Sequence, residues 1–167
     1  MTGSEKNSYR REELEAAGVG DLFGQDAPRL PMPGFLMLDR VIRVSDTGGA
    51  FEKGEIIGEL DIRPDLWFFQ YHFQGDPVMP GNLELEALMQ LAGFFMAWKG
   101  YKGRARALGA GELRYSGEVL PAADKAVFQL DIRRVRTTPI LLVVADGTVL
   151  CGDRVVATAK QIKVGVF

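Results

Sequence analysis

The chain has 167 residues, of which 47% are hydrophobic and 25% are charged, a composition typical of one globular domain spanning residues 1–167. Its formal net charge of −2 argues against nucleic acid as a partner, because phosphate binding usually needs a basic surface. The single cysteine, Cys151, excludes an intramolecular disulfide, and with only one histidine we expect no metal site and no cofactor.

Neither the N-terminal segment nor the longest apolar stretch of the sequence indicates export or insertion into a membrane. The N-terminal segment is polar and carries charges of both signs, unlike a secretory signal. The longest strongly apolar stretch, Leu91–Trp98, is far shorter than the roughly 20 residues that a membrane-spanning helix needs. We therefore expect no membrane span and a cytoplasmic location.

The first third of the chain predicts one short helix and two strands. Residues Tyr9–Ala17 are typical of a helix, which Gly18 and Gly20 are expected to end. Phe35–Ser45 is apolar and β-branched enough for a strand. A glycine-containing turn signal then leads into a second strand at about Phe51–Ile62.

The middle of the chain predicts a long buried helix. Pro64–Phe73 is rich in aromatic residues, and prolines and glycines between residues 75 and 81 break any regular element. Asn82–Trp98 contains no proline and is too long for an ordinary strand. Since this segment is apolar nearly all round, we expect a helix that is buried on most sides.

The remainder of the chain returns to the period-two alternation of strands. The expected strands are Arg104–Val119 (one long or bent strand), the segment around Phe128–Arg133, Ile140–Ala145, Thr148–Cys151 and Val155–Phe167. Asp146-Gly147 stands between two of them and is the strongest hairpin signal in the chain. Together these elements predict an α+β arrangement of about six mostly antiparallel strands beside one long helix.

The only histidine, His72, lies in the loop directly ahead of the predicted buried helix. Pro80 and Gly81 stand where the helix is expected to begin, and Asn82 is a candidate N-cap. A helix N-terminus offers unpaired backbone N–H groups and the positive end of the helix dipole. These donors suit a developing oxyanion, such as the carbonyl oxygen of a thioester that is being enolised.

Two acidic residues, Glu84 and Glu86, lie in the first turns of the same helix. They are about 200° apart round the helix, so they cannot both face one site. A carboxyl group in apolar surroundings has a raised pKa, which suits a general acid. A histidine base and one such acid are the minimum set for β-elimination of water. Spacing alone also fits ordinary roles, a hydrogen-bonded structural histidine and acids that complement the helix dipole.

Several short segments form a further pattern: Gly20–Gly24, Leu36–Arg40, Glu59–Ile62, Pro64–Phe69, His72–Phe73, Gly75–Gly81, Arg106–Gly109 and Lys163–Gly165. Together they resemble the 3-hydroxydecanoyl-acyl-carrier-protein dehydratase family of bacterial type II fatty acid synthesis. The resemblance extends over nearly the whole chain and is not confined to one motif.

This resemblance implies a hot-dog fold, in which an antiparallel sheet wraps a long central helix. It also implies a homodimer with its active sites at the interface, where His72 of one subunit faces the acidic residue, here Glu86, on the other subunit's helix. The Gly81 N–H group is then expected to hold the thioester carbonyl, and the Val78 carbonyl to orient the His72 ring. The acyl chain would occupy an apolar tunnel, with phosphopantetheine entering from the surface.

Three residues in this region depart from the family pattern. Glu86 stands at the place of the catalytic aspartate, Asn82 at that of a cysteine, and Glu84 at that of a glycine. Sister dehydratases that do not isomerise carry glutamate at the first place. We therefore expect dehydration of (3R)-hydroxyacyl-acyl carrier protein to the trans-2-enoyl product without isomerisation to cis-3, in fatty acid or related lipid or polyketide biosynthesis, with Asn82 close to substrate.

A basic cluster of Arg133, Arg134 and Arg136, with Lys125 nearby, interrupts the otherwise acidic chain. It is either an ordinary solvated strand face or, as the resemblance implies, part of the surface that docks the acidic acyl carrier protein. Two alternative functions stay open. The same fold hosts acyl-thioesterases, and the three departures also fit a non-catalytic protein that binds acyl thioesters.

Overall fold

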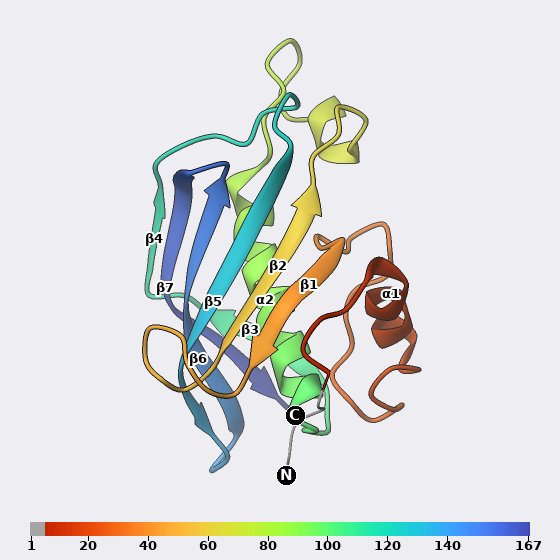
Figure 1. Cartoon of the computed structure of the whole chain (residues 1–167), viewed down its shortest axis with the longest axis vertical. Helices are drawn as coiled ribbons and strands as arrows, with labels where there is room; N and C mark the ends of the chain where they lie inside the picture. The colour runs from red at the N-terminus through yellow and green to blue at the C-terminus, as the bar shows by residue number, and fades with distance from the viewer. Residues whose placement is uncertain (1–5) are drawn as a thin grey trace.

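The computed structural model describes residues 6–167, in which one long helix lies against the concave face of an antiparallel sheet (Figure 1). The helices are α1 (Arg11–Val19), the short 3-10 helix η1 (Trp67–Gln70) and α2 (Gly81–Trp98). The strands are β1 (Arg40–Ser45), β2 (Glu55–Asp61), β3 (Ala105–Gly109), β4 (Glu112–Tyr115), β5 (Lys125–Arg136), β6 (Leu141–Cys151) and β7 (Arg154–Val166).

The seven strands form a single sheet in the order β1-β2-β5-β6-β7-β3, and β4 also pairs with β7. Every pairing is antiparallel. Figure 1 shows α2 crossing the sheet and α1 beside β1, away from the central helix. This sheet wrapped around one helix confirms the α+β class and the hot-dog fold.

The core lies between α2 and the sheet. Along β5, Phe128, Leu130 and Ile132 alternate toward the helix and are fully buried. Almost every residue of α2 after Ala87 is buried too, as the all-round apolar pattern predicts.

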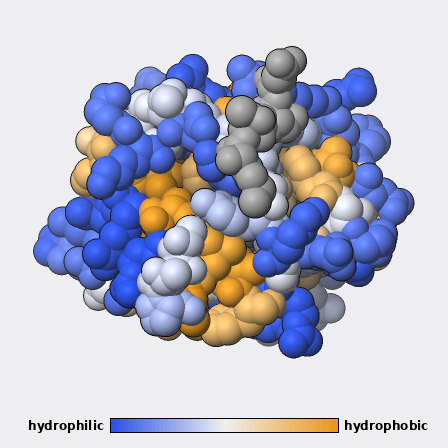
Figure 2. Space-filling view, turned by 90° about the horizontal axis from the view of Figure 1, so that it is seen from below, coloured by the Kyte–Doolittle hydropathy of each residue, from blue (hydrophilic) through white to orange (hydrophobic). Residues whose placement is uncertain are grey.

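Within residues 6–167 no helix combines the length and the hydropathy that crossing a membrane requires. Seen from below, the molecule exposes some apolar surface between hydrophilic rims (Figure 2).

The boundaries of the first elements differ from the sequence prediction. Helix α1 continues through Gly18 and ends at Gly20, which adopts the left-handed conformation with φ of +86°. Gly18 is buried inside the helix, where a Cβ atom would lie 3.3 Å from the carbonyl oxygen of Leu30. Because Gly18 has no side chain, the helix can pack closely against the Leu30 carbonyl. Only Gly20 ends the helix.

The predicted strand over residues 104–119 divides into β3 and β4, which both pair with β7. Gly109, with φ of +148°, stands at the division. Strands β1 and β2 are also shorter at their starts than the apolar pattern indicates. Because the predicted strand divides at Gly109, β3 lies at the free edge of the sheet, next to α2.

The prediction of a hairpin at Asp146-Gly147 is wrong, because β6 continues without a break through both residues. The turn that follows β6 lies at residues 152–153, where Cys151 pairs with Arg154. Within β6, the pairing with β7 shifts register between Ala145 and Gly147, which marks a β-bulge. The turn-like dipeptide therefore serves a bulge inside a long strand.

Tertiary contacts explain this choice. The Asp146 carboxylate accepts hydrogen bonds from the Arg133 guanidinium and from the backbone N–H of Gln161. Gly147 leaves room for α2, since a Cβ atom there would lie 2.5 Å from Cδ1 of Leu88. Both contacts join residues that are distant in the sequence, so the local pattern carries no sign of them.

We expect Gly147→Ala to lower the free energy of unfolding by about 1–3 kcal/mol, because the added methyl group overlaps the buried Leu88 side chain. Urea unfolding measures the change. Gly34→Ala is the matched control, since no atom lies within 4 Å of the Cβ position there. Equal destabilisation by the two substitutions would contradict the packing argument.

Candidate active site

The loop between η1 and α2 holds the His72 ring in a defined orientation. Backbone hydrogen bonds join the His72 N–H to the Phe68 carbonyl at 3.0 Å and the Val78 N–H to the His72 carbonyl at 2.8 Å. Nδ1 of the ring lies 2.9 Å from the carbonyl oxygen of Val78. Because a carbonyl oxygen only accepts, Nδ1 must carry the hydrogen, which leaves the Nε2 lone pair of the neutral ring available as a base.

The start of α2 is shaped by close contact with β4. Gly81 is the first residue of the helix, and a Cβ atom there would lie 2.4 Å from Cε1 of Tyr115. The tyrosine ring thus packs directly against the helix N-terminus, which requires glycine. Pro80 is the N-cap residue, whereas Asn82 is exposed and lies inside the first turn. The prediction of Asn82 as N-cap is therefore wrong, since the N-cap is Pro80, two residues earlier, and the helix begins at Gly81.

Glu86 is oriented by a residue that the sequence analysis missed. Its Oε1 atom accepts a hydrogen bond of 2.9 Å from Nε2 of Gln90, one helical turn later. Gln90 is itself buried, and bonds to the Phe35 carbonyl at 3.0 Å and the Met37 N–H at 2.9 Å. Gln90 is the one amide of the helix after its first turn, and it stands four residues after a glutamate, which is the signal that points to this network.

The half-buried Glu86 side chain opens onto a hollow of about 150 Å³ between α2 and β3. Met89 and Gly93 continue the helix wall of this hollow, and Ala105 and Ala107 form its strand wall. No hydrogen bond joins Glu86 to His72 within residues 6–167. One chain thus presents a histidine in the loop ahead of α2 and a carboxyl group in a separate hollow beside the free edge of the sheet.

Glu84 occupies a different environment from Glu86, as their helical spacing predicts. Its side chain is buried, with 2% exposure, and Oε2 has no hydrogen-bond partner within the described residues. Burial raises the pKa of its carboxyl group to about 7. Burial also raises the pKa of Tyr115 and of Cys151, and the nearby Glu84 charge adds to both increases. The raised pKa expected of a carboxyl group in this helix is therefore found at Glu84, beneath the β4 side of α2.

The predicted arginine cluster does not form one surface. Arg133 makes two hydrogen bonds to Asp146, at 2.6 and 2.7 Å, and its guanidinium lies over the ring of Phe51. A bulge in the pairing with β6 at this position separates it from Arg134 and Arg136, which share the other face of the strand. Lys125 begins the same strand, about 30 Å from Arg134, and pairs with Glu59.

Register across the sheet brings two further basic residues to the face of Arg134 and Arg136. Arg134 aligns with Val144 and then Lys163, while Arg136 aligns with Leu142, Gly165 and Arg106. Directly opposed residues in antiparallel strands point to the same face. We call the four exposed side chains Arg106, Arg134, Arg136 and Lys163 the outer basic surface. None of them forms an ion pair in the part of the chain that the structure describes.

The chain resembles known proteins both in sequence and in fold. The family model of the FabA-like domain matches residues 30–160. In the dehydratase heterocomplex ApeI:P from Xenorhabdus doucetiae, the matching chain has a TM-score of 0.63 and 16% identity, with coverage of 81% of this chain and 85% of that one.

Two other solved structures share the fold. S. sahachiroi AziG matches with a TM-score of 0.55 and 13% identity, covering 76% of this chain and 89% of its own. An uncharacterised protein from Pyrococcus horikoshii matches with a TM-score of 0.54 and 14% identity, covering 79% and 84%. Identities this low establish a common fold and leave the chemistry to be argued from the site.

We expect Glu84→Gln to stabilise the protein at pH 8 but much less at pH 4. The folded state holds the Glu84 proton up to a pKa of about 7, whereas the unfolded chain releases it near 4.5, so wild-type stability falls between these values. The difference corresponds to about 3 kcal/mol, which the glutamine variant does not lose. Denaturant unfolding at both pH values measures it, with the exposed Glu118→Gln as control. A gain independent of pH would contradict the assignment.

Proposed function

Because this chain belongs to the FabA-like domain family, we propose that it is a dehydratase that removes water from (3R)-hydroxyacyl chains on acyl carrier protein. The product is the trans-2-enoyl thioester. The observation that carries the proposal is the contact of His72 Nδ1 with the Val78 carbonyl, because it fixes the tautomer that a base needs. Glu86, oriented by Gln90, supplies the acid.

Each step uses a group already described. Nε2 of His72 removes a proton from the carbon next to the thioester, and the electron pair forms the new double bond as the C3 hydroxyl leaves. The Glu86 carboxylic acid protonates that hydroxyl, so that water departs. Transfer of the proton from the histidine to the Glu86 carboxylate restores both groups. The N-terminus of α2 at Gly81 stabilises the negative charge on the thioester oxygen.

A homodimer completes the site in this proposal. Because no hydrogen bond joins His72 to Glu86 within residues 6–167, we propose that His72 acts with Glu86 of the partner subunit. Two features support this. Strand β3 is a free sheet edge with its Leu108 side chain 48% exposed. The aromatic residues that flank His72 are also exposed, Tyr71 to 77% and Phe73 to 54%. Such edges and rims are typical of surfaces covered by a second copy.

The product is expected to keep its trans-2 double bond. Glutamate at position 86 reaches further than aspartate, which changes where the acid stands relative to the substrate. Asn82 is exposed in the first turn of α2, where it can contact the thioester arm. We propose a cytoplasmic role in fatty acid or related lipid or polyketide biosynthesis.

We expect His72→Ala and Glu86→Gln each to lower turnover of 3-hydroxydecanoyl-acyl carrier protein by about 10²–10⁴-fold, since each removes one proton-transfer group. Mass spectrometry of the product measures loss of water. Gln74→Ala, at an exposed position in the loop that carries His72, keeps both groups and is the control for local disturbance. Release of free thiol in place of water would instead indicate a thioesterase.

Mixing the two inactive variants tests whether the site is shared between subunits. A mixed dimer contains one intact His72 facing one intact Glu86, so exchange of subunits should restore about a quarter of wild-type turnover if dimers form at random. Native mass spectrometry confirms that mixed dimers have formed. Mixed dimers without turnover would contradict the shared site.

The outer basic surface is the proposed docking site for acyl carrier protein, which is strongly acidic. We expect Arg134→Glu with Arg136→Glu to raise KM for the carrier-bound substrate about tenfold or more, through loss of attraction across the interface. Turnover of the same acyl group on free phosphopantetheine should be unchanged. Arg133 is left intact, because it holds Asp146 within the sheet. An unaltered KM for the carrier-bound substrate would contradict docking at this surface.

A further inference from the structure

Glu84 is a buried acid that the proposed dehydration does not use. It is the fourth residue of α2 and so belongs to the first turn, whose backbone N–H groups begin the helix. Its side chain is 2% exposed, and Oε2 has no hydrogen-bond partner in the part of the chain that the structure describes. A buried carboxyl group without a partner costs free energy, and such groups in native proteins often serve a function.

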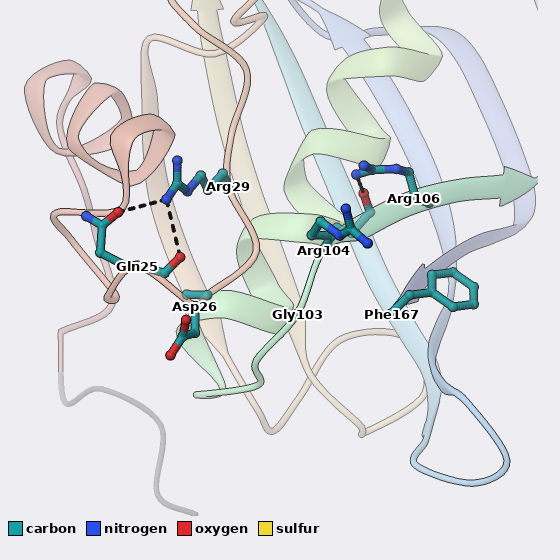
Figure 3. Close-up of a pocket in the computed structure, with 9 residues that line it drawn as sticks. Gln25, Asp26, Arg29, Gly103, Arg104, Arg106 and Phe167 are labelled. Carbon is teal, nitrogen blue, oxygen red and sulfur yellow. Dashed lines mark hydrogen bonds between the residues drawn. The ribbon is translucent and has the colours of Figure 1, made fainter.

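Among residues 6–167, no cation offsets a negative charge at Glu84. This side chain takes part in no ion pair there, and burial alone raises the pKa of its carboxyl group. Arg29, Arg104 and Arg106 instead line a pocket at the start of β3 (Figure 3). An ionised Glu84 would therefore act on its surroundings as an uncompensated charge.

Two ionisable side chains from neighbouring strands sense the charge of Glu84. Burial raises the pKa of Tyr115 of β4 and of Cys151 of β6, and the Glu84 charge raises both further. Arg154 of β7 lowers the pKa of Cys151 but does not act on Glu84. On its own helix, Glu86 lies about 200° away round the axis. The field of an ionised Glu84 thus extends to side chains of two strands.

The ring of Tyr115 lies between this region and the first residue of the helix. A Cβ atom on Gly81 would lie 2.4 Å from Cε1 and 2.6 Å from Cζ of the ring, so the ring shields the helix start from water on the β4 side. From Gly81 to Glu84 the helix rises by only about 4.5 Å, at 1.5 Å per residue. Charges this close interact strongly where water is excluded.

An ionised Glu84 would oppose the oxyanion of the proposed reaction. The N-terminus of a helix carries roughly half a positive charge, which stabilises a negative oxygen at the Gly81 N–H group. A full negative charge in the same turn exceeds this and repels the oxyanion. The neutral carboxylic acid leaves the helix dipole unopposed.

Resting on the proposed function, we propose that Glu84 is a positioning residue that acts through the Gly81 N–H group, because the start of α2 stabilises the thioester oxyanion fully only while Glu84 holds its proton. Burial raises the pKa of this carboxyl group to about 7, so the proton is lost as pH rises through neutrality. Turnover therefore falls on the alkaline side.

Nuclear magnetic resonance tests this coupling without any turnover. In proton–nitrogen correlation spectra of the whole protein from about pH 5.5 to 9, the Gly81 amide signal should shift with the same midpoint as the carboxyl carbon of Glu84. Glu84→Gln should remove the shift. Glu12→Gln, an exposed glutamate in the first turn of α1, is the matched control and should leave it intact. A Gly81 amide that does not titrate, or that titrates alike in Glu84→Gln, would overturn the proposal.

The pH profile of turnover tests the consequence. With 3-hydroxydecanoyl-acyl carrier protein, wild-type kcat should fall about tenfold between about pH 6.5 and 9, because a nearby charge weakens an oxyanion donor whose complete loss costs about 10²–10³-fold. Glu84→Gln should keep kcat nearly level, and circular dichroism confirms that both proteins are folded at each pH. An alkaline fall that is unchanged in Glu84→Gln would belong to Glu86, the proposed acid, and would contradict the role of Glu84.

The two measurements separate this proposal from the proposed function. Absence of water loss at every pH would end the dehydratase proposal, while titration of the Gly81 amide with Glu84 would still establish the coupling. Water loss together with a Gly81 amide that ignores Glu84 would end the coupling and leave the dehydratase standing.

Discussion

The apolar contact between α2 and the concave face of the sheet holds every part of the candidate site. Side chains on all sides of the helix are buried, so its axis and rotation are fixed against the strands. That rotation sends Glu84 and Glu86 into different environments, one beneath β4 and one beside β3. It also fixes the N-terminus of the helix next to the His72 loop. A change in this packing would therefore move Glu86, the proposed acid, together with the N-terminal N–H groups of α2, the proposed oxyanion donors.

Two carboxyl groups two residues apart thus differ because of what surrounds them. Glu86 has a hydrogen-bonding neighbour in Gln90 and opens onto a hollow, which suits an acid that meets substrate. Glu84 is enclosed, its Oε2 atom has no hydrogen-bond partner among residues 6–167, and its pKa is near neutrality, so burial of this group lowers stability increasingly as pH rises. Tyr115 of β4 packs against Gly81 and is close enough to Glu84 for the glutamate charge to raise its pKa. Strand β4 therefore shapes the start of the helix.

The arginines at the end of β5 differ in their contacts. Arg133 is engaged with Asp146 and Phe51, whereas Arg134 and Arg136 face solvent beside Lys163 and Arg106. Under the proposed function, these four exposed cations would attract an acidic carrier protein, although the chain as a whole has a net negative charge.

The sequence by itself determined the fold class, the long buried helix and the position of His72 ahead of it, because these follow from periodicity, length and helix-breaking residues. It also separated Glu84 from Glu86, since helical geometry alone sets their angle. Only the tertiary structure decided that Asp146-Gly147 lies inside a strand, that Arg133 is held by Asp146, and that Gln90 orients Glu86. Each of these features depends on residues that are distant in the sequence or on burial in the folded core. Strand register and loop packing bring such residues together, and local sequence patterns carry no information about these contacts.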